Sequence, residues 1–158
     1  MNIDSNFLTL RSYQDADAGE IFKLFYDTVH TINKFDYSDV ELDAWASPST
    51  DVSSWANKTL DNKTIVAVKG GKILGFGDID MMGFIGHLYV HGDYVDLGIG
   101  TVIYDYLESS IKSNVYSTFA SITSKNFFQN KGYKVERENT VERNGVLLTN
   151  YLMTKNKK

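Results

Sequence analysis

The sequence predicts a mixed α/β fold, in which helices flank a central, mostly antiparallel sheet within a single domain that spans residues 1–158. Segments with helical periodicity alternate with segments of strand character, and turn residues separate adjacent strands. One strand runs directly into a glycine turn that opens a helix. A chain of 158 residues with 42% hydrophobic content can bury one core, which fits a single domain.

The first third of the chain is predicted to form a short strand and three helices. Residues Phe7 to Arg11 alternate apolar and polar side chains, as a half-buried strand does. From Asp15 to His30 apolar residues recur at intervals of three and four behind an acidic start, which favours an amphipathic helix. Shorter helices are expected at Ser38 to Ala46, with Ser38 as the cap, and at Val52 to Leu60.

The rest of the chain alternates strands with two helices. Gly70-Gly71 predicts a two-residue hairpin turn, and Asn144-Gly145 predicts another. The helix after Gly100 carries one apolar stripe, made of Ile99, Val102, Ile103, Tyr106, Leu107 and Ile111. The expected strands are Thr64–Val68, Ile73–Ile79, Phe84–Val90, Tyr116–Ala120, Lys134–Val141 and Val146–Thr154, and the expected helices are Thr101–Ile111 and Thr123–Asn130.

Composition narrows the classes of function. A net charge of −4 and the lack of a basic stripe argue against nucleic-acid binding. The absence of cysteine excludes a disulfide, a thiolate nucleophile and a zinc–thiolate site. The first residues lack the blocks of a signal peptide, and no apolar run approaches the roughly 20 residues of a membrane span. We therefore expect a cytoplasmic protein that binds neither membrane nor nucleic acid.

The most informative segment is the turn Tyr94-Val95-Asp96-Leu97-Gly98-Ile99-Gly100-Thr101. A helix that starts here leaves its first N–H groups unpaired beside the positive end of its dipole, which suits phosphate oxygens. Glycines let a ligand approach the backbone, although an ordinary tight turn also uses them. A dinucleotide-binding turn would need a third glycine at Ile103, and a phosphate-loop NTPase would need a Gly-Lys-Ser/Thr ending, so neither class fits.

Two segments in this order resemble the GCN5-related N-acetyltransferase superfamily. Leu88 to Gly100 is similar to the acyl-CoA pyrophosphate loop. Ser121 to Tyr133 is similar to a later motif, which runs from a small or amide residue to an aromatic pair and then to glycine plus an aromatic. The resemblance implies a sheet splayed at its fourth and fifth strands. It also implies acetyl-CoA as co-substrate, a small amine as acceptor, and a homodimer as a common assembly.

The resemblance also implies which residues bind the cofactor. Val95 stands where the family usually has Gln or Arg, and Asp96 stands where it often has Gly. Phe128 replaces a tyrosine that can protonate the leaving thiolate. These departures keep a second hypothesis open, that of a non-catalytic CoA-binding or interaction module. The implied cofactor-binding residues are Leu88, Tyr89, Val90, Val95, Asp96, Leu97, Gly98, Ile99, Gly100, Thr101, Ser121, Asn126, Phe128 and Lys131.

Amine acetylation requires a polarised thioester carbonyl and a proton acceptor. A strand-edge N–H near Val90 can polarise the carbonyl. His87 is the candidate proton acceptor because histidine titrates near neutral pH, and a water chain to solvent is the alternative. Tyr89 and Tyr151 are candidate acids, although packing roles suit them as well. No metal site is expected, because His87 and His91 lack a third ligand.

The acceptor pocket is expected between the early helical block and the last hairpin. Phe25, Tyr26, His30 and Tyr37 are the candidate substrate-binding residues. Their aromatic and polar character suits a small amine better than a large acidic ligand. The same side chains can instead serve the core.

Overall fold

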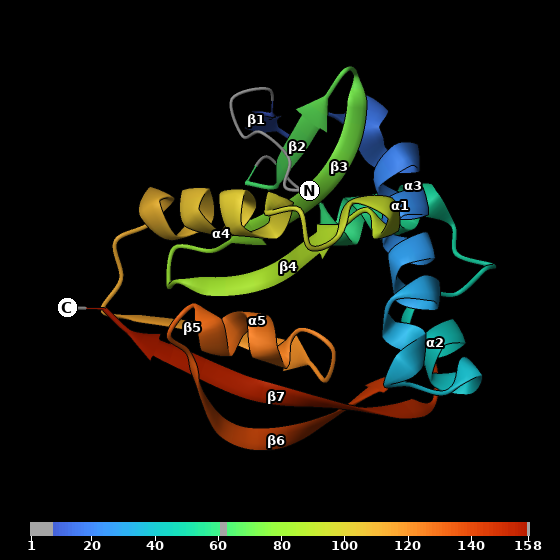
Figure 1. Cartoon of the computed structure of the whole chain (residues 1–158). Coiled ribbons are helices and arrows are strands. Elements are labelled where there is room, and N and C mark those ends of the chain that lie inside the picture. The colour runs from blue at the N-terminus through green and yellow to red at the C-terminus, as the bar shows by residue number, and fades with distance from the viewer. Residues whose placement is uncertain (1–7, 61–62, 158) are drawn as a thin grey trace.

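A seven-stranded sheet of order β1-β2-β3-β4-β5-β7-β6 forms the centre of the molecule, with helices on both faces (Figure 1). The structure is a computed structural model and describes residues 8–60 and 63–157. The strands are β1 (Thr9–Ser12), β2 (Ile65–Lys69), β3 (Lys72–Ile79), β4 (Phe84–Val90), β5 (Val115–Ser121), β6 (Lys134–Arg143) and β7 (Val146–Asn156). The helices are α1 (Ala18–Thr31), α2 (Asp39–Trp45), α3 (Val52–Thr59), α4 (Ile99–Ser110) and α5 (Lys125–Asn130), with single 3-10 turns η2 (Asp15–Asp17), η3 (Asn33–Phe35) and η4 (Gly92–Tyr94).

The predicted mixed α/β class and element order are confirmed, and the bounds differ by a few residues. The start of the first predicted strand, Phe7, lies outside the described residues. The first helix begins as the 3-10 turn η2, where the Asp17 carboxylate accepts a hydrogen bond from the Gln14 N–H at 2.9 Å. Ser38 caps α2 as predicted, since its hydroxyl accepts from the Glu41 N–H. Side-chain caps therefore set where these early helices start.

Each face of the sheet buries its own apolar cluster. Helices α1, α2 and α3 cover one face, and α4 and α5 cover the other. On α4 the predicted stripe is wrong at one position: Tyr106 is exposed, whereas Tyr104 is buried beside Phe128 and Tyr133. A stripe of helical period cannot by itself decide which of two nearby tyrosines faces the core. No helix in the described ranges is long and apolar enough to cross a membrane.

The sheet opens between β4 and β5, its one parallel pair among the described strands. These two strands pair only at Phe84 with Ser117 and at Ile85 with Thr118. The buried Thr118 hydroxyl donates to the Ile85 carbonyl at 2.9 Å and ties the strands together at this point. Beyond it they diverge, as Figure 1 shows, and the expected splay at the fourth and fifth strands is present.

Candidate active site

A cleft of about 1350 Å³ occupies the opening between β4 and β5 and extends onto both faces of the sheet. At one end it reaches the start of α4 and the side chain of Phe127 on α5. At the other end it is lined by residues of α1, α2, α3 and the β6–β7 hairpin. One continuous space therefore joins the predicted cofactor loop to the predicted acceptor pocket.

The start of α4 is shaped to receive an anion. Gly98 stands at the helix N-cap with φ +93°, a left-handed conformation that favours glycine. No side chain caps α4 and no acidic residue occupies its first turn, within the part of the chain that the structure describes. In contrast, Ser38 caps α2 and Asp51 caps α3. The first N–H groups of α4 thus remain for an external acceptor beside the cleft.

The free edge of β4 supplies further backbone groups. The carbonyls of His87 and Tyr89 face β3, where each would lie 2.9 Å from a Cβ added at Gly77 or Gly75. Because backbone groups alternate along a strand, those of Leu88 and Val90 face the opening toward β5. The Thr28 hydroxyl already donates to the Val90 carbonyl at 2.9 Å. The N–H groups of Leu88 and Val90 are therefore directed into the cleft.

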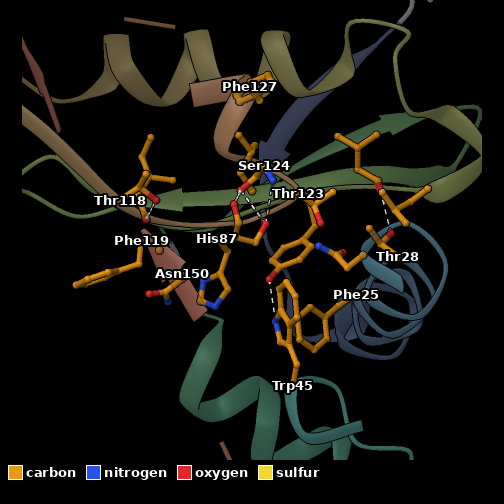
Figure 2. A pocket seen from close by; sticks show the side chains of 18 of the residues that line it. Phe25, Thr28, Trp45, His87, Thr118, Phe119, Thr123, Ser124, Phe127 and Asn150 are labelled. Carbon is orange, nitrogen blue, oxygen red and sulfur yellow. Dashed lines mark hydrogen bonds between the residues drawn. The ribbon is translucent and has the colours of Figure 1, made fainter. Parts of the chain in front are cut away.

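A histidine–aspartate pair lies on the acceptor side of β4. The Asp78 carboxylate is 2.6 Å from Nδ1 of His87 and also accepts from the Gly86 N–H at 3.1 Å. Gly86 is the extra residue of a β-bulge, since Asp78 pairs with His87 while Ile79 pairs with Ile85. Because an ionised carboxylate can only accept, Nδ1 of His87 donates, and in the neutral imidazole Nε2 keeps its lone pair. His87 lines the cleft (Figure 2), so this lone pair is available to a ligand.

Aromatic side chains build the acceptor end of the cleft. The Trp45 Nε1–H donates to the Tyr89 hydroxyl at 3.2 Å, and Figure 2 shows this contact beside Phe25. Tyr37 donates its hydroxyl to the Thr149 carbonyl at 2.7 Å and accepts from the Ile122 N–H. Burial raises the pKa of Tyr89 well above its usual value, so its hydroxyl stays protonated. It accepts a hydrogen bond from Trp45 and keeps its own proton, so the role of an acid stays a prediction.

Several predicted site residues lie outside the cleft. Tyr26 stacks on His30 within α1, and His30 joins α1 to the end of α2 because its Nε2 contacts the Ala46 carbonyl at 2.8 Å. Tyr151 packs with the cluster under α4 and α5 and lies beneath the Lys125 ammonium. Lys131 is 3.4 Å from Asp105 on α4. Leu97 and Asn126 do not contribute to the lining either.

The cleft does bring together most of the predicted cofactor residues. Phe25 and Tyr37, predicted for the acceptor, line it as well. Sequence reasoning missed Asp78, although a carboxylate within an otherwise apolar strand was an available signal. It also missed Phe127, Asn150 and Arg143, which reach the cleft from α5, β7 and β6. The predicted cofactor residues in the lining are Leu88, Tyr89, Val90, Val95, Asp96, Gly98, Ile99, Gly100, Thr101, Ser121 and Phe128.

Comparison with known proteins identifies the class. Residues 33–155 match the model of the acetyltransferase (GNAT) domain. The Escherichia coli (strain K12) protein named "Uncharacterized N-acetyltransferase YafP" is 30% identical over 149 residues, which cover 94% of this chain and 95% of that protein. The chain therefore belongs to the GCN5-related N-acetyltransferase family.

Solved structures agree with this membership. A GCN5-related N-acetyltransferase from Rhodopseudomonas palustris superposes with a TM-score of 0.88 and 32% identity, covering 94% of this chain and 95% of that chain. PaiA N-acetyltransferase from Thermoplasma acidophilum, solved in complex with coenzyme A, gives a TM-score of 0.69 over 95% of this chain and 99% of that chain. At 13% identity the second likeness concerns the fold alone.

Proposed function

We propose that this protein transfers the acetyl group of acetyl-CoA to the amine of a small acceptor, by direct attack within a ternary complex. One observation carries the proposal: a single cleft joins the uncapped start of α4 to the His87–Asp78 pair. The start of α4 can bind the diphosphate of acetyl-CoA, and His87 can accept a proton from the amine. Both substrates can therefore meet in the same cleft.

The backbone of α4 and β4 would hold acetyl-CoA. The N–H groups at the start of α4 receive the pyrophosphate, with the helix dipole adding attraction. From there the pantetheine arm runs along the free edge of β4 and pairs with its backbone like an added strand. This direction leads from Val90 toward His87 and brings the thioester beside the Leu88 N–H, which polarises its carbonyl.

His87 would take the proton of the attacking amine. The amine nitrogen bonds to the carbonyl carbon, the carbon–sulfur bond breaks, and the proton moves to Nε2 of His87. The departing thiolate takes up a proton from solvent. Asp78 fixes the tautomer in which Nε2 is the acceptor, and its negative charge stabilises the imidazolium that forms.

A second candidate is a CoA-binding module without turnover, and Asp96 favours it. Asp96 lines the cofactor end of the cleft and adds a negative charge where a diphosphate would bind. A binding measurement with acetyl-CoA, followed by a turnover assay over a broad amine panel, separates the candidates. We expect binding and acetyl transfer. Binding without transfer to any amine would favour the module, and no binding would reject both.

A further inference from the structure

We propose that the amine acceptor also carries a carboxylate, which Arg143 binds at the far end of the cleft. This inference rests on the proposed function and extends it to the class of substrate. The argument depends on the charges of the lining, on how Arg143 is held, and on what surrounds the rest of the acceptor.

The charges along the cleft are divided between its two ends. Among the described residues that line it, Arg143 is the one lysine or arginine and Asp96 is the one carboxylate. Asp96 stands at the cofactor end, beside the start of α4, whereas Arg143 stands on the β6–β7 hairpin. Asp78 lies behind His87, and its two carboxylate oxygens accept hydrogen bonds from the Gly86 N–H and from His87 Nδ1. Among the described lining residues, the acceptor end therefore presents a permanent positive charge and no carboxylate.

Arg143 is an exposed residue of the cleft lining and has no acidic partner among the described residues. It ends β6, in register with Val146, and the next residue, Asn144, anchors the hairpin tip by donating its amide to the Ala44 carbonyl at 2.9 Å. The guanidinium donates to the Glu142 carbonyl at 3.2 Å and forms no ion pair with any described residue. The other N–H groups of the planar guanidinium thus remain for an external anion, and a carboxylate can accept two of them at once.

The positive charge of Arg143 reaches the interior of the acceptor end. Burial raises the pKa of the Tyr89 hydroxyl, and the charge of Arg143 opposes that rise. The charge of Arg143 therefore acts on the Tyr89 hydroxyl, which accepts the hydrogen bond of Trp45. A carboxylate held by Arg143 would belong to a ligand whose remaining atoms contact these rings.

The aromatic walls of the acceptor end suit the apolar part of a ligand. Phe25 stacks on Trp55 with ring centroids 5.2 Å apart, and Tyr37 meets Trp45 edge-on at the same separation. The polar atoms of Tyr37 and Trp45 are occupied by protein partners, so the rings offer mainly their carbon surface. An aromatic or branched amino acid, or a short peptide with such a side chain, has the required amine, apolar body and carboxylate. A polyamine lacks a carboxylate for Arg143 and would find none to receive its extra charges.

Matched acceptors test this inference. Initial rates are measured for phenylalanine and phenylalanylglycine, each beside its C-terminal amide, with phenethylamine and spermidine as acceptors without a carboxylate. The amino acid and the dipeptide place the carboxylate at different distances from the amine. The proteins are the wild type, Arg143→Ala, and Arg137→Ala as the matched control, because Arg137 lies on the same strand outside the cleft lining.

We expect at least one free acid to exceed its amide in kcat/KM by about tenfold with the wild type, as a charge-assisted hydrogen bond would give. Arg143→Ala should abolish that preference, and Arg137→Ala should keep it. Equal rates for acids and amides, or a preference that survives in Arg143→Ala, would overturn the inference while leaving the transferase intact.

A binding arm keeps the test informative if no amine is acetylated, an outcome that would reject the proposed function instead. Binding of N-acetylphenylalanine and its amide to the CoA-saturated proteins is then measured by equilibrium dialysis. Tighter binding of the acid that is lost in Arg143→Ala supports the carboxylate site. Equal binding of acid and amide, or no binding of either, contradicts it.

Discussion

At the scale of single residues, Asp78 links the shape of β4 to the chemistry of His87. One carboxylate oxygen accepts from the Gly86 N–H at the bulge and the other meets His87 Nδ1. A Cβ at position 86 would lie 2.6 Å from the first oxygen, so glycine at the bulge makes this approach feasible. The bulge and the orientation of the imidazole therefore depend on the same side chain.

Replacing either member of the pair should lower turnover more than cofactor binding. We expect His87→Ala to reduce kcat by about 100-fold, the usual scale of general base catalysis, and Asp78→Asn to reduce it by a smaller factor. The KM for acetyl-CoA should change little, because neither side chain lies at the start of α4. Steady-state kinetics check this. His91→Ala is the control, since His91 accepts from the Asp93 N–H and lies outside the cleft lining. Full activity in His87→Ala would remove the proposed base.

Asp96 combines an unfavourable charge with an unfavourable backbone conformation. Its φ is +64°, a left-handed value that glycine adopts at lower cost than other residues. We expect Asp96→Asn, which removes the charge alone, to tighten acetyl-CoA binding severalfold. Asp96→Gly should also raise the stability by about 0.5–1 kcal/mol, from relief of the backbone. Calorimetric titration and urea unfolding measure the two effects. Weaker binding in both variants would show that the carboxylate helps to hold the ligand.

At the scale of elements, α4 approaches β3 closely because two positions of this strand are glycines. Gly75 and Gly77 lie beneath the helix, and a Cβ at Gly77 would be 2.9 Å from the His87 carbonyl and 3.1 Å from both Ile103 and Leu107. The close approach of helix to sheet therefore requires glycine at this position. It also fixes the start of α4 relative to the free edge of β4.

Gly77→Ala should accordingly lower the stability of the fold. The added methyl group meets a backbone carbonyl that cannot yield, so we expect a loss of about 1–3 kcal/mol in unfolding free energy, typical of overpacking. Urea denaturation provides the measurement. Gly145→Ala is a control without a steric clash, because a Cβ there meets no heavy atom within 4 Å, although its positive φ adds some strain. If Gly77→Ala were the less disruptive of the two, the close approach would not limit stability.

The start of α4 gives a separate test of the cofactor site. A Cβ at Gly100 would lie 3.5 Å from Phe127 and from Val90, an ordinary contact, so the fold can accept one. The larger side chain of Gly100→Val would extend into the cleft that Gly100 lines. We expect this variant to remain folded and to lose acetyl-CoA binding, as judged by circular dichroism and calorimetric titration. Unchanged affinity would reject the assignment of the loop.

At the scale of the whole molecule, the order of the elements could be predicted because periodicity and turn residues are local properties. The hairpin turns at Gly70-Gly71 and Asn144-Gly145 and the glycine-led start of α4 needed no knowledge of distant contacts. The Asp78–His87 pair could not be predicted, because the bulge at Gly86 shifts the register of β4. If the register were counted from Ile79 and Ile85 without a bulge, Asp78 would be paired with Gly86 instead of His87.

The acceptor residues were the least predictable part for the same reason. His30 and Tyr26 stand on a helix whose orientation the sequence leaves open; in the structure His30 contacts the end of α2 and Tyr26 stacks on His30. Arg143 comes to the cleft from more than 50 residues beyond His87, through the pairing of β7 with both β5 and β6. Long-range sheet order, which no local pattern specifies, therefore decides which charges line the cleft.

A cluster of charges joins α4 to the last strand and should couple the stability of the fold to pH. Glu108 accepts from Lys155 at 2.7 Å and from the Tyr104 hydroxyl, and Lys157 lies 3.6 Å away. Burial by itself would raise the pKa of Glu108, but the hydrogen bonds from Lys155 and Tyr104 outweigh it and lower the pKa below 4.5. The ionised form is therefore favoured in the folded state. This stabilisation is fully present above pH 4.5 and is lost as the pH falls through the folded pKa.

Glu108→Gln should therefore destabilise the protein at neutral pH by about 1–3 kcal/mol, since two hydrogen-bond donors and the Lys157 ammonium lose a charged partner. The difference between variant and wild type should shrink when urea unfolding is repeated at falling pH below 4.5, because the unfolded chain takes up the proton first and folded Glu108 follows at its lower pKa. Asp105→Asn is the control on the same helix, because its contact with Lys131 is exposed and contributes little. A difference that stays constant with pH would mean that Glu108 acts through packing rather than charge. In that case the contact between Glu108 on α4 and Lys155 on β7 would not weaken in acid, and α4 would stay in place beside the cleft at low pH.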